Sequence, residues 1–172
     1  MQFISENYKE LNEKLHKTNK DYGKSGKHNV DDVIKLSRML DTTNILDYGC
    51  GKSTLQQQLP FKIQQYDPAV AKYSNLPNPA DIVVCTDVLE HIEPDNLANV
   101  LLHIHELTQR AAFLVIATRP AKKTLEDGRN AHLIVKDMIW WLNVLRECGF
   151  YIHMVENKKD QEFKVICTKR EN

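Results

Sequence analysis

Short apolar runs alternate along the chain with segments in which apolar residues recur every three or four positions. The runs are bounded by Gly, Pro, Asn or Asp and predict strands, whereas the periodic segments predict helices. We expect strands at 43–48, 62–67, 81–89, 111–118, 150–157 and 162–170, and helices at 5–20, 30–40, 52–59, 94–109 and 135–148.

This alternation defines a class of fold. Buried strands separated by helices predict a parallel sheet that is covered on both faces. The last two strands are joined only by residues 158–161, so they predict an antiparallel hairpin. We therefore expect an α/β protein, a Rossmann-like three-layer sandwich with a mostly parallel sheet and a C-terminal antiparallel hairpin.

Composition narrows the possible partners. The 172 residues suit one domain with a full core, and 42% hydrophobic and 27% charged residues are typical of a globular protein. Lys plus Arg and Asp plus Glu each number 23, so the formal net charge is zero. The general electrostatic argument for binding nucleic acid or membranes is therefore missing, with a local basic patch as the alternative, and we expect a small-molecule partner.

The cysteine residues and the N-terminal sequence indicate the cellular compartment of the protein. Cys85, Cys148 and Cys167 lie within or beside apolar runs, and no C-x-x-C pair occurs, which predicts buried thiols in a reducing compartment. No apolar stretch approaches the ~20 residues of a membrane span, and "MQFISENYKE" lacks a signal-peptide core. We expect a cytoplasmic protein.

The stretch "ILDYGCGKST", residues 45–54, has two interpretations. Its end is similar to a phosphate-binding P-loop, G-x-x-x-x-G-K-[ST]. That pattern requires a first glycine at position 46, which is Leu46, and the carboxylate of Asp47 would repel phosphates. We therefore reject the P-loop and do not expect Lys52 to bind a nucleotide triphosphate.

The second interpretation is the glycine turn after the first strand of a Rossmann-type sheet. Gly49 and Gly51 allow a tight turn, and a following helix N-terminus favours an anionic group. Asp67 ends the next strand and is placed to bind ribose hydroxyls. A nicotinamide dinucleotide stays possible, although its third fingerprint glycine is Thr54 here. Asp47 favours a cofactor with positive charge, as in S-adenosylmethionine, which carries an ammonium and a sulfonium.

Three motifs in order carry a family resemblance. "ILDYGCGKST", "YDP" and "DIVVCTDVLEHIEP" resemble successive motifs of the class I S-adenosylmethionine-dependent methyltransferases, and "DVLEHI" is similar to their small-molecule O- and C-methyltransferase branch. The resemblance covers about residues 44–149. It implies S-adenosylmethionine as cofactor and a small-molecule or nucleotide-like acceptor. The alternative is a non-catalytic module of the same fold that binds a cofactor or a partner.

The resemblance also implies roles for individual residues. The first motif would hold the methionine part of the cofactor, Asp67 the ribose, and Glu90 with His91 the floor near the transferred methyl group. The implied cofactor-binding residues are Asp47, Tyr48, Gly49, Cys50, Gly51, Asp67, Pro68, Asp87 and Val88. In this family the N-terminal region commonly covers the acceptor, so residues 1–41, with Tyr8 and Tyr22, are expected to form a helical cap on a core of residues 42–172.

The chain departs from the family pattern at two places. The third glycine of the first motif is Ser53. Only 13 residues, 68–80, separate Asp67 from Asp81, so we expect that one edge strand is missing. No acidic residue in this segment can be assigned to the adenine, and Tyr73 or Leu76 is the candidate to pack on it.

Candidate catalytic residues come from two segments. His91 is either a general base or a residue that packs at the start of the next helix. The loop 119–134 is rich in hydrogen-bond donors and suits an anionic or carbonyl-bearing acceptor, or is a solvated surface loop. In the first interpretation Arg129 orients the acceptor, and Asn130 and His132 fix its angle.

Two further expectations concern histidine and tryptophan. His103 and His105 point to different helix faces, and His91 and His132 have no Cys or carboxylate cluster at ligand spacing, so we expect no metal site. Of Trp140 and Trp141, one is expected in the core and one at the edge of the acceptor pocket, with core packing of both as the alternative.

Overall fold

The computed structural model describes residues 2–19 and 23–170; Tyr22 lies outside these ranges. The described residues form one six-stranded sheet in the order β2-β1-β3-β4-β6-β5. The strands are β1 (Ile45–Tyr48), β2 (Gln64–Tyr66), β3 (Ala80–Thr86), β4 (Thr108–Ala117), β5 (Phe150–Lys158) and β6 (Glu162–Lys169). Strands β1 to β4 pair in parallel, and β6 is antiparallel to both β4 and β5, which confirms the predicted sheet.

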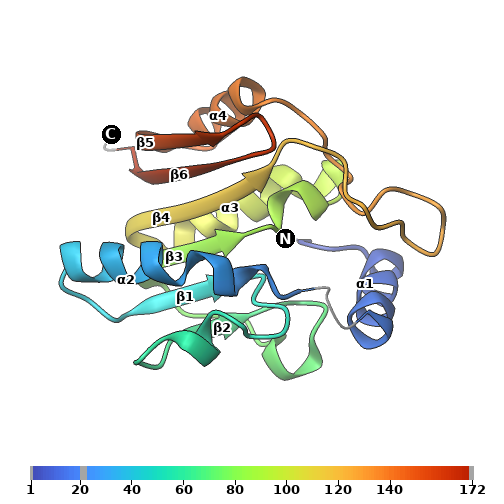
Figure 1. Ribbon diagram of the computed structural model, residues 1–172, viewed down its shortest axis with the longest axis horizontal. Helices are drawn as coiled ribbons and strands as arrows, with labels where there is room; N and C mark the ends of the chain where they lie inside the picture. Colours follow the sequence, from blue (N-terminus) through green and yellow to red (C-terminus); the bar gives the residue numbers. More distant parts are fainter. Residues whose placement is uncertain (1, 20–22, 171–172) are drawn as a thin grey trace.

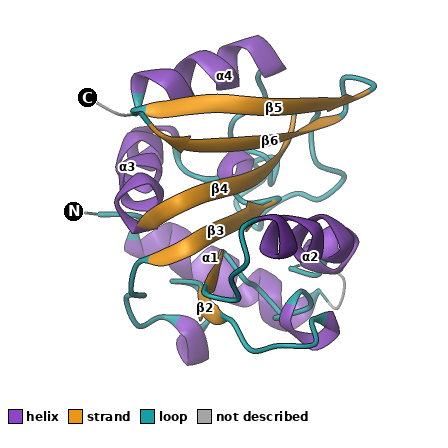
Figure 2. Ribbon diagram, turned by 90° about the vertical axis from the view of Figure 1, so that its left-hand side faces the viewer, coloured by secondary structure: helices purple, strands orange, loops and turns teal. Residues whose placement is uncertain are grey.

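Helices cover both faces of the sheet, and Figure 2 shows α2 and α3 on opposite sides. The four α-helices of the described residues are α1 (Glu6–Thr18), α2 (Val30–Met39), α3 (Leu97–Leu107) and α4 (Met138–Glu147). Strand β4 shows why the sheet has two cores. Phe113 and Val115 pack with α2, whereas Ala112, Leu114 and Ile116 pack with α3 and α4, because neighbouring strand residues point to opposite faces.

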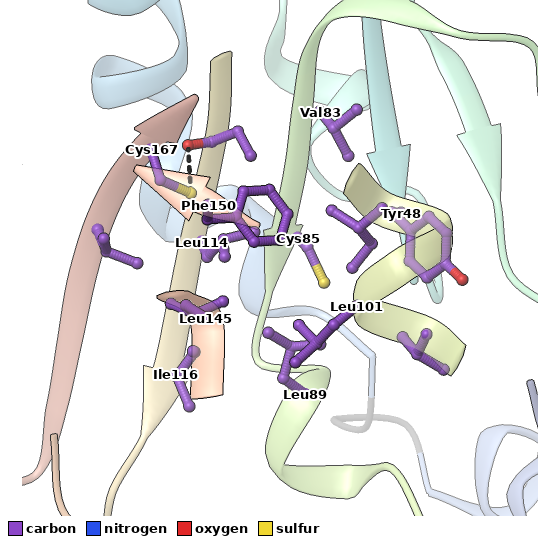
Figure 3. Packing of buried hydrophobic residues seen from close by; sticks show 14 of the residues in the cluster. Tyr48, Val83, Cys85, Leu89, Leu101, Leu114, Ile116, Leu145, Phe150 and Cys167 are labelled. Carbon is purple, nitrogen blue, oxygen red and sulfur yellow. Dashed lines mark hydrogen bonds between the residues drawn. The ribbon is translucent and has the colours of Figure 1, made fainter. Parts of the chain in front are cut away.

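The larger core lies between the sheet, α3 and α4. Figure 3 shows Leu101 of α3, Leu145 of α4 and Leu114 of β4 converging there. Trp141 is fully buried in this core, and Trp140 packs against it partly exposed. Neither tryptophan lines one of the cavities described below, so the placement of one at the acceptor pocket is wrong and core packing of both is correct.

The sheet ends at β2, as expected from the short interval after Asp67. Residues 67–79 contain only a 3-10 turn, Ala71–Tyr73. Pro77 and Pro79 lack the backbone N–H that a further strand would need for pairing. The predicted absence of one edge strand is confirmed for the described residues.

The helix predicted at 52–59 is absent. Ser53 has a positive φ of 61°, and only Gln56–Gln58 form a 3-10 turn before Pro60. The amide of Lys52 instead donates to the carbonyl of Gly23, at 2.9 Å. No α-helix N-terminus therefore follows the glycine turn, so the helix-based argument for binding an anion there was wrong.

The carboxyl ends of the parallel strands carry two further segments. In Figure 1, α1 and the loop between β4 and α4 both lie beyond these ends. They contact each other through Tyr8 of α1 and Leu125 and Ala131 of the loop. Both segments are thus placed where parallel α/β sheets bind ligands. Within residues 2–19 and 23–170, every helix is too short or too polar to cross a bilayer.

Candidate active site

A cavity of about 100 Å³ lies at the carboxyl ends of β1, β2 and β3. The structure brings to it all nine residues that the resemblance implied for the cofactor: Asp47, Tyr48, Gly49, Cys50, Gly51, Asp67, Pro68, Asp87 and Val88. We refer to it as the first cavity. These residues lie at or just after the ends of three separate strands, because the carboxyl ends of neighbouring parallel strands meet at one edge of the sheet.

The glycine turn packs too tightly for side chains. Gly49 has a φ of 78°, and a Cβ placed on it would lie 2.4 Å from a methyl group of Val88. Gly51, with a φ of 51°, would place a Cβ 2.8 Å from the carbonyl oxygen of Gly23. Only glycine combines this backbone conformation with such close approach. The turn therefore lets the N-terminal segment come directly against β1.

Two buried carboxyl groups face the first cavity. The two oxygens of Asp67 accept the amides of Gly51 and Ala69, each at 2.9 Å. Burial raises the pKa of Asp67, and burial together with the charge of Asp67 raises the pKa of Asp47 to about 7. Among the described residues that line this cavity there is no Lys or Arg. The carboxyl pair is therefore arranged for a cationic ligand.

The N-terminal segment forms one wall of the first cavity. Tyr8 donates a 2.5 Å hydrogen bond to the carbonyl of His91, and the Ser5 hydroxyl donates to Glu93 at 2.7 Å. Seven residues of this segment line the cavity: Phe3, Ile4, Tyr8, His16, Gly23, Ser25 and Gly26. Sequence reasoning missed His16. It follows Tyr8 by eight residues, which turns the helix by about 80° beyond two full turns, so the two side chains share one broad side of α1 and this signal was available.

A second cavity, of about 540 Å³, adjoins the first. The two cavities share Gly23, Ser25, Asp87 and His91 in their linings. Six cationic side chains line the second cavity against two carboxylates: Lys24, Lys27, Arg119, Lys122, Lys123 and Lys158 against Asp87 and Glu162. The protein has no net charge, but this cavity has an excess of positive charge.

Arg129 and Asn130 do not reach the second cavity, which corrects the role predicted for them. The guanidinium of Arg129 pairs with Asp127 at 2.6 Å on the surface. The amide of Asn130 bonds to both the N–H and the carbonyl of Ala121, at 2.9 Å each, and so braces the loop. Local hydrogen bonds within the loop therefore hold both side chains away from the second cavity.

His132 does line the second cavity, and its tautomer is fixed. Its Nδ1 lies 2.6 Å from the carbonyl oxygen of Arg119. A carbonyl can only accept, so Nδ1 carries the hydrogen, and in the neutral imidazole the lone pair is on Nε2. The ring meets that of His91 edge to face, with centroids 4.7 Å apart.

His91 sits where the two cavities meet. Burial lowers its pKa to about 4, against the opposing effect of Asp87. The imidazole is therefore neutral near pH 7, but its proton affinity is low for a general base that works at that pH. His91 lines the first cavity together with the nine residues named above.

The structure overturns the premise on which a metal site was excluded. Asp87, Glu90, His91 and His132 each offer a ligand atom, and these four atoms all lie within 4.8 Å of one another. Asp87, Glu90 and His91 lie within five consecutive residues: Glu90 and His91 belong to the 3-10 turn Leu89–His91, and Asp87 precedes it. That spacing was a usable signal, whereas the approach of His132 depends on the tertiary fold.

A third cavity, of about 400 Å³, continues from the first through His16, Gly51 and Ala69. Tyr73 lines it, whereas Leu76 is 70% exposed and lies outside the lining. Of the two residues considered for adenine packing, only Tyr73 is therefore placed beside the ligand space.

The strand order, the glycine turn and the paired carboxyl groups define a class. The chain has the fold of the class I S-adenosylmethionine-dependent methyltransferases. At the level of sequence, no protein-family model and no curated protein matches it.

Solved structures with this fold superpose on most of the chain. The 1,6-didemethyltoxoflavin-N1-methyltransferase of Burkholderia thailandensis, with bound 1,6-didemethyltoxoflavin and S-adenosylhomocysteine, is 13% identical at a TM-score of 0.68, covering 96% of this chain and 90% of that one. The magnesium protoporphyrin IX methyltransferase of Synechocystis PCC 6803, with bound S-adenosylmethionine, is 17% identical at a TM-score of 0.61, covering 95% and 97%. An O-methyltransferase family protein from B. thailandensis is 14% identical at a TM-score of 0.66, covering 99% and 64%.

Proposed function

We propose that this protein transfers a methyl group from S-adenosylmethionine to an anionic small molecule. One observation carries the proposal: a cavity with two buried carboxyl groups meets a strongly cationic cavity at Asp87 and His91. The first suits the ammonium and sulfonium of the cofactor, and the second suits a negatively charged acceptor. Nucleotide-like metabolites and organic acids fit the second cavity better than neutral compounds.

The residues of the first cavity fit the cofactor. Asp47 would attract its ammonium group, the turn at Gly49 and Gly51 would admit its methionine part without steric clash, and Asp67 would accept the ribose hydroxyls. Tyr73, beside the third cavity, would pack on the adenine. Phe3 to His16 of the N-terminal segment would cover the ligand, and this cap would exclude water from the reaction.

The protein has to align the reactants. When bound, the cofactor supplies an electrophilic methyl carbon, which bonds to the acceptor as the carbon–sulfur electrons return to sulfur. The chain contributes alignment, since Asp87 and His91 border both cavities and fix the place where the reactants meet. The lysines of the second cavity bind the negatively charged group of the acceptor, and the buried walls of the first cavity exclude water from the reaction.

Calorimetry with S-adenosylmethionine and S-adenosylhomocysteine tests the first half of this proposal. A methyltransferase is expected to bind both ligands at a ratio of one per chain. Transfer of a labelled methyl group to a panel that pairs each phosphate or carboxylate with an uncharged analogue tests the second half. Labelled products are expected among the anions. If neither ligand binds, the chain is instead a non-catalytic module of this fold.

Removing charge from the second cavity should impair the acceptor alone. The double variant Lys122→Gln and Lys123→Gln is expected to lower kcat/KM for the anionic acceptor about tenfold, since each exposed charge contact is worth about 0.5–1 kcal/mol. Cofactor affinity should stay within about threefold of the unmodified protein. Lys62→Gln, an exposed lysine outside all three cavities, is the matched control. Equal losses in the control would contradict an acceptor role.

Cofactor binding should depend on pH through Asp47. Its pKa of about 7 means that the ionised form, which attracts the ammonium, grows as the pH rises through 7. Calorimetry is expected to show affinity increasing about fivefold from pH 6 to pH 7. Conversely, the free protein loses stability as the pH rises from the ordinary value of 3.8 to about 7, because the fold favours neutral Asp47. Asp47→Asn should flatten both profiles; an unchanged pH dependence in this variant would assign it to another group.

A further inference from the structure

The junction of the two cavities holds a cluster of side chains that methyl transfer by alignment does not explain. Asp87 comes from the end of β3, Glu90 and His91 from the turn after it, and His132 from the loop between β4 and α4. Their four ligand atoms lie within 4.8 Å of one another. Ligands on opposite sides of a single ion, each about 2.2 Å from it, are about 4.4 Å apart. The cluster therefore has nearly the dimensions of a coordination shell.

Glu90 points to a ligand independently of this spacing. It is fully buried, and its Oε1 accepts the amide of Ala117 at 2.8 Å. Its Oε2 is also buried, and no described residue donates a hydrogen bond to it. A buried carboxylate oxygen without a donor is costly unless a cation or another group satisfies it.

The other members are held in the form in which they bind metals. His132 donates its Nδ1–H to the carbonyl of Arg119. Metal-binding imidazoles commonly make such a hydrogen bond, because it fixes the orientation of the ring and leaves Nε2 to bind the metal. Asp87 has a positive φ of 59°, a conformation that Gly, Asn and Asp adopt more readily than other residues.

We propose that Asp87, Glu90, His91 and His132 bind one divalent cation of the manganese class, and that this ion binds a hydroxyl oxygen of the acceptor. Two carboxylates and two imidazoles suit Mn²⁺ and its neighbours better than Ca²⁺, which prefers oxygen alone. Four protein ligands leave two positions open in an octahedral shell. Asp87 and His91 line both cavities, so the ion lies where the acceptor meets the methyl donor.

The proposed ion also restricts which chemical groups the acceptor must carry. An ion at this place lowers the pKa of a bound hydroxyl, whose proton then passes to water in the second cavity. The lysines of that cavity hold a separate negative charge of the same molecule. The acceptor is therefore an anionic compound with a free hydroxyl group, and oxygen is the atom that receives the methyl group. This last step rests on the proposed function, whereas binding of the ion does not.

Metal binding is tested with Mn²⁺ on the cofactor-free protein after treatment with EDTA. Electron paramagnetic resonance should show one Mn²⁺ bound per chain. Glu90→Gln keeps the shape and the contact to Ala117, and it should weaken Mn²⁺ binding about 10- to 100-fold. Asp87→Asn should do the same, and Asn tolerates the positive φ at this position, so this variant covers the case in which the buried Glu90 variant fails to fold.

Asp95→Asn, an exposed carboxylate on the same connection, is the matched control and should bind Mn²⁺ as the unmodified protein does. Absence of Mn²⁺ binding, or unchanged binding in both Asp87→Asn and Glu90→Gln, overturns the metal site. S-adenosylmethionine calorimetry on the EDTA-treated protein separates the two proposals. If the protein binds S-adenosylmethionine but not Mn²⁺, only the proposed metal site is refuted. If it binds Mn²⁺ but not S-adenosylmethionine, only the proposed methyltransferase function is refuted.

The acceptor role has its own test. Methyl transfer to hydroxyl-bearing anions should fall at least tenfold in EDTA and return with Mn²⁺. His132→Gln should lose most of this Mn²⁺-dependent rate while binding S-adenosylmethionine within about threefold of the unmodified protein, because His132 is outside the lining of the first cavity. Transfer that is indifferent to EDTA would overturn the assignment of the ion to the acceptor.

Discussion

Asp67→Ala is expected to weaken binding of S-adenosylmethionine by roughly 1.5–3 kcal/mol, which is about 10- to 150-fold in Kd. Asp67 is buried at the end of β2 and lines the first cavity, where its carboxylate would accept hydrogen bonds from the ribose hydroxyls. Hydrogen bonds to a charged acceptor in a dry site are among the stronger ones in proteins. Calorimetry at fixed pH and salt measures the loss.

The same carboxylate accepts the amides of Gly51 and Ala69, so a change in the turn must be separated from loss of the ribose contact. Asp67→Asn retains one oxygen acceptor and should lose less affinity than Asp67→Ala. Thermal unfolding of both variants reports on the turn itself. Unchanged affinity in an Asp67→Ala protein that stays folded would remove Asp67 from the cofactor site.

Gly49→Ala is expected to destabilise the fold by roughly 2–5 kcal/mol. A positive φ for a residue with a Cβ costs about 1–2 kcal/mol, and forcing a methyl group into packed atoms costs about 1–3 kcal/mol more. Here the new Cβ would lie 2.4 Å from a methyl group of Val88. Since Val88 also lines the first cavity, cofactor affinity should fall together with stability. Urea unfolding and calorimetry measure the two effects.

Gly128 provides the matched control for this variant. Its φ is 88°, but a Cβ placed on it would have no heavy atom within 4 Å. Gly128→Ala should therefore show only the backbone cost, about 1–2 kcal/mol, and leave cofactor binding unchanged. Adding Val88→Ala to Gly49→Ala should recover part of the lost stability. Equal destabilisation by Gly49→Ala and Gly128→Ala would refute the steric account.

Local patterns were enough to predict most of the sheet. Strands β1, β3 and β4 contain apolar runs in a chain that has to bury them, whereas the more polar β2 was indicated by the flanking Pro60 and Pro68, and parallel neighbours share one edge. The glycine turn, Asp67 and Asp87 could therefore be assigned to one cavity before any coordinates. The hairpin β5–β6 followed from a connection too short for a crossover helix.

The failures have a common cause in contacts that the hydrophobic pattern does not show. The helix expected at 52–59 is absent, and here the amide of Lys52 bonds to Gly23, far away in sequence. Arg129 and Asn130 bear the donors that suit an acceptor, but their partners Asp127 and Ala121 within the folded loop occupy them. Composition identifies donors, and only the loop conformation decides which of them stay available.

The sequence by itself determined the class of fold, the residues that line the first cavity and the missing edge strand. Each depends on hydrophobic period, turn chemistry or strand polarity, which are properties of a few consecutive residues. The tertiary structure alone decided that His132 comes within 4.8 Å of Asp87, Glu90 and His91, and that a neutral chain concentrates six cationic side chains on one cavity. Such groupings join residues from separate loops, and their positions follow from the packing of the whole domain rather than from any local spacing.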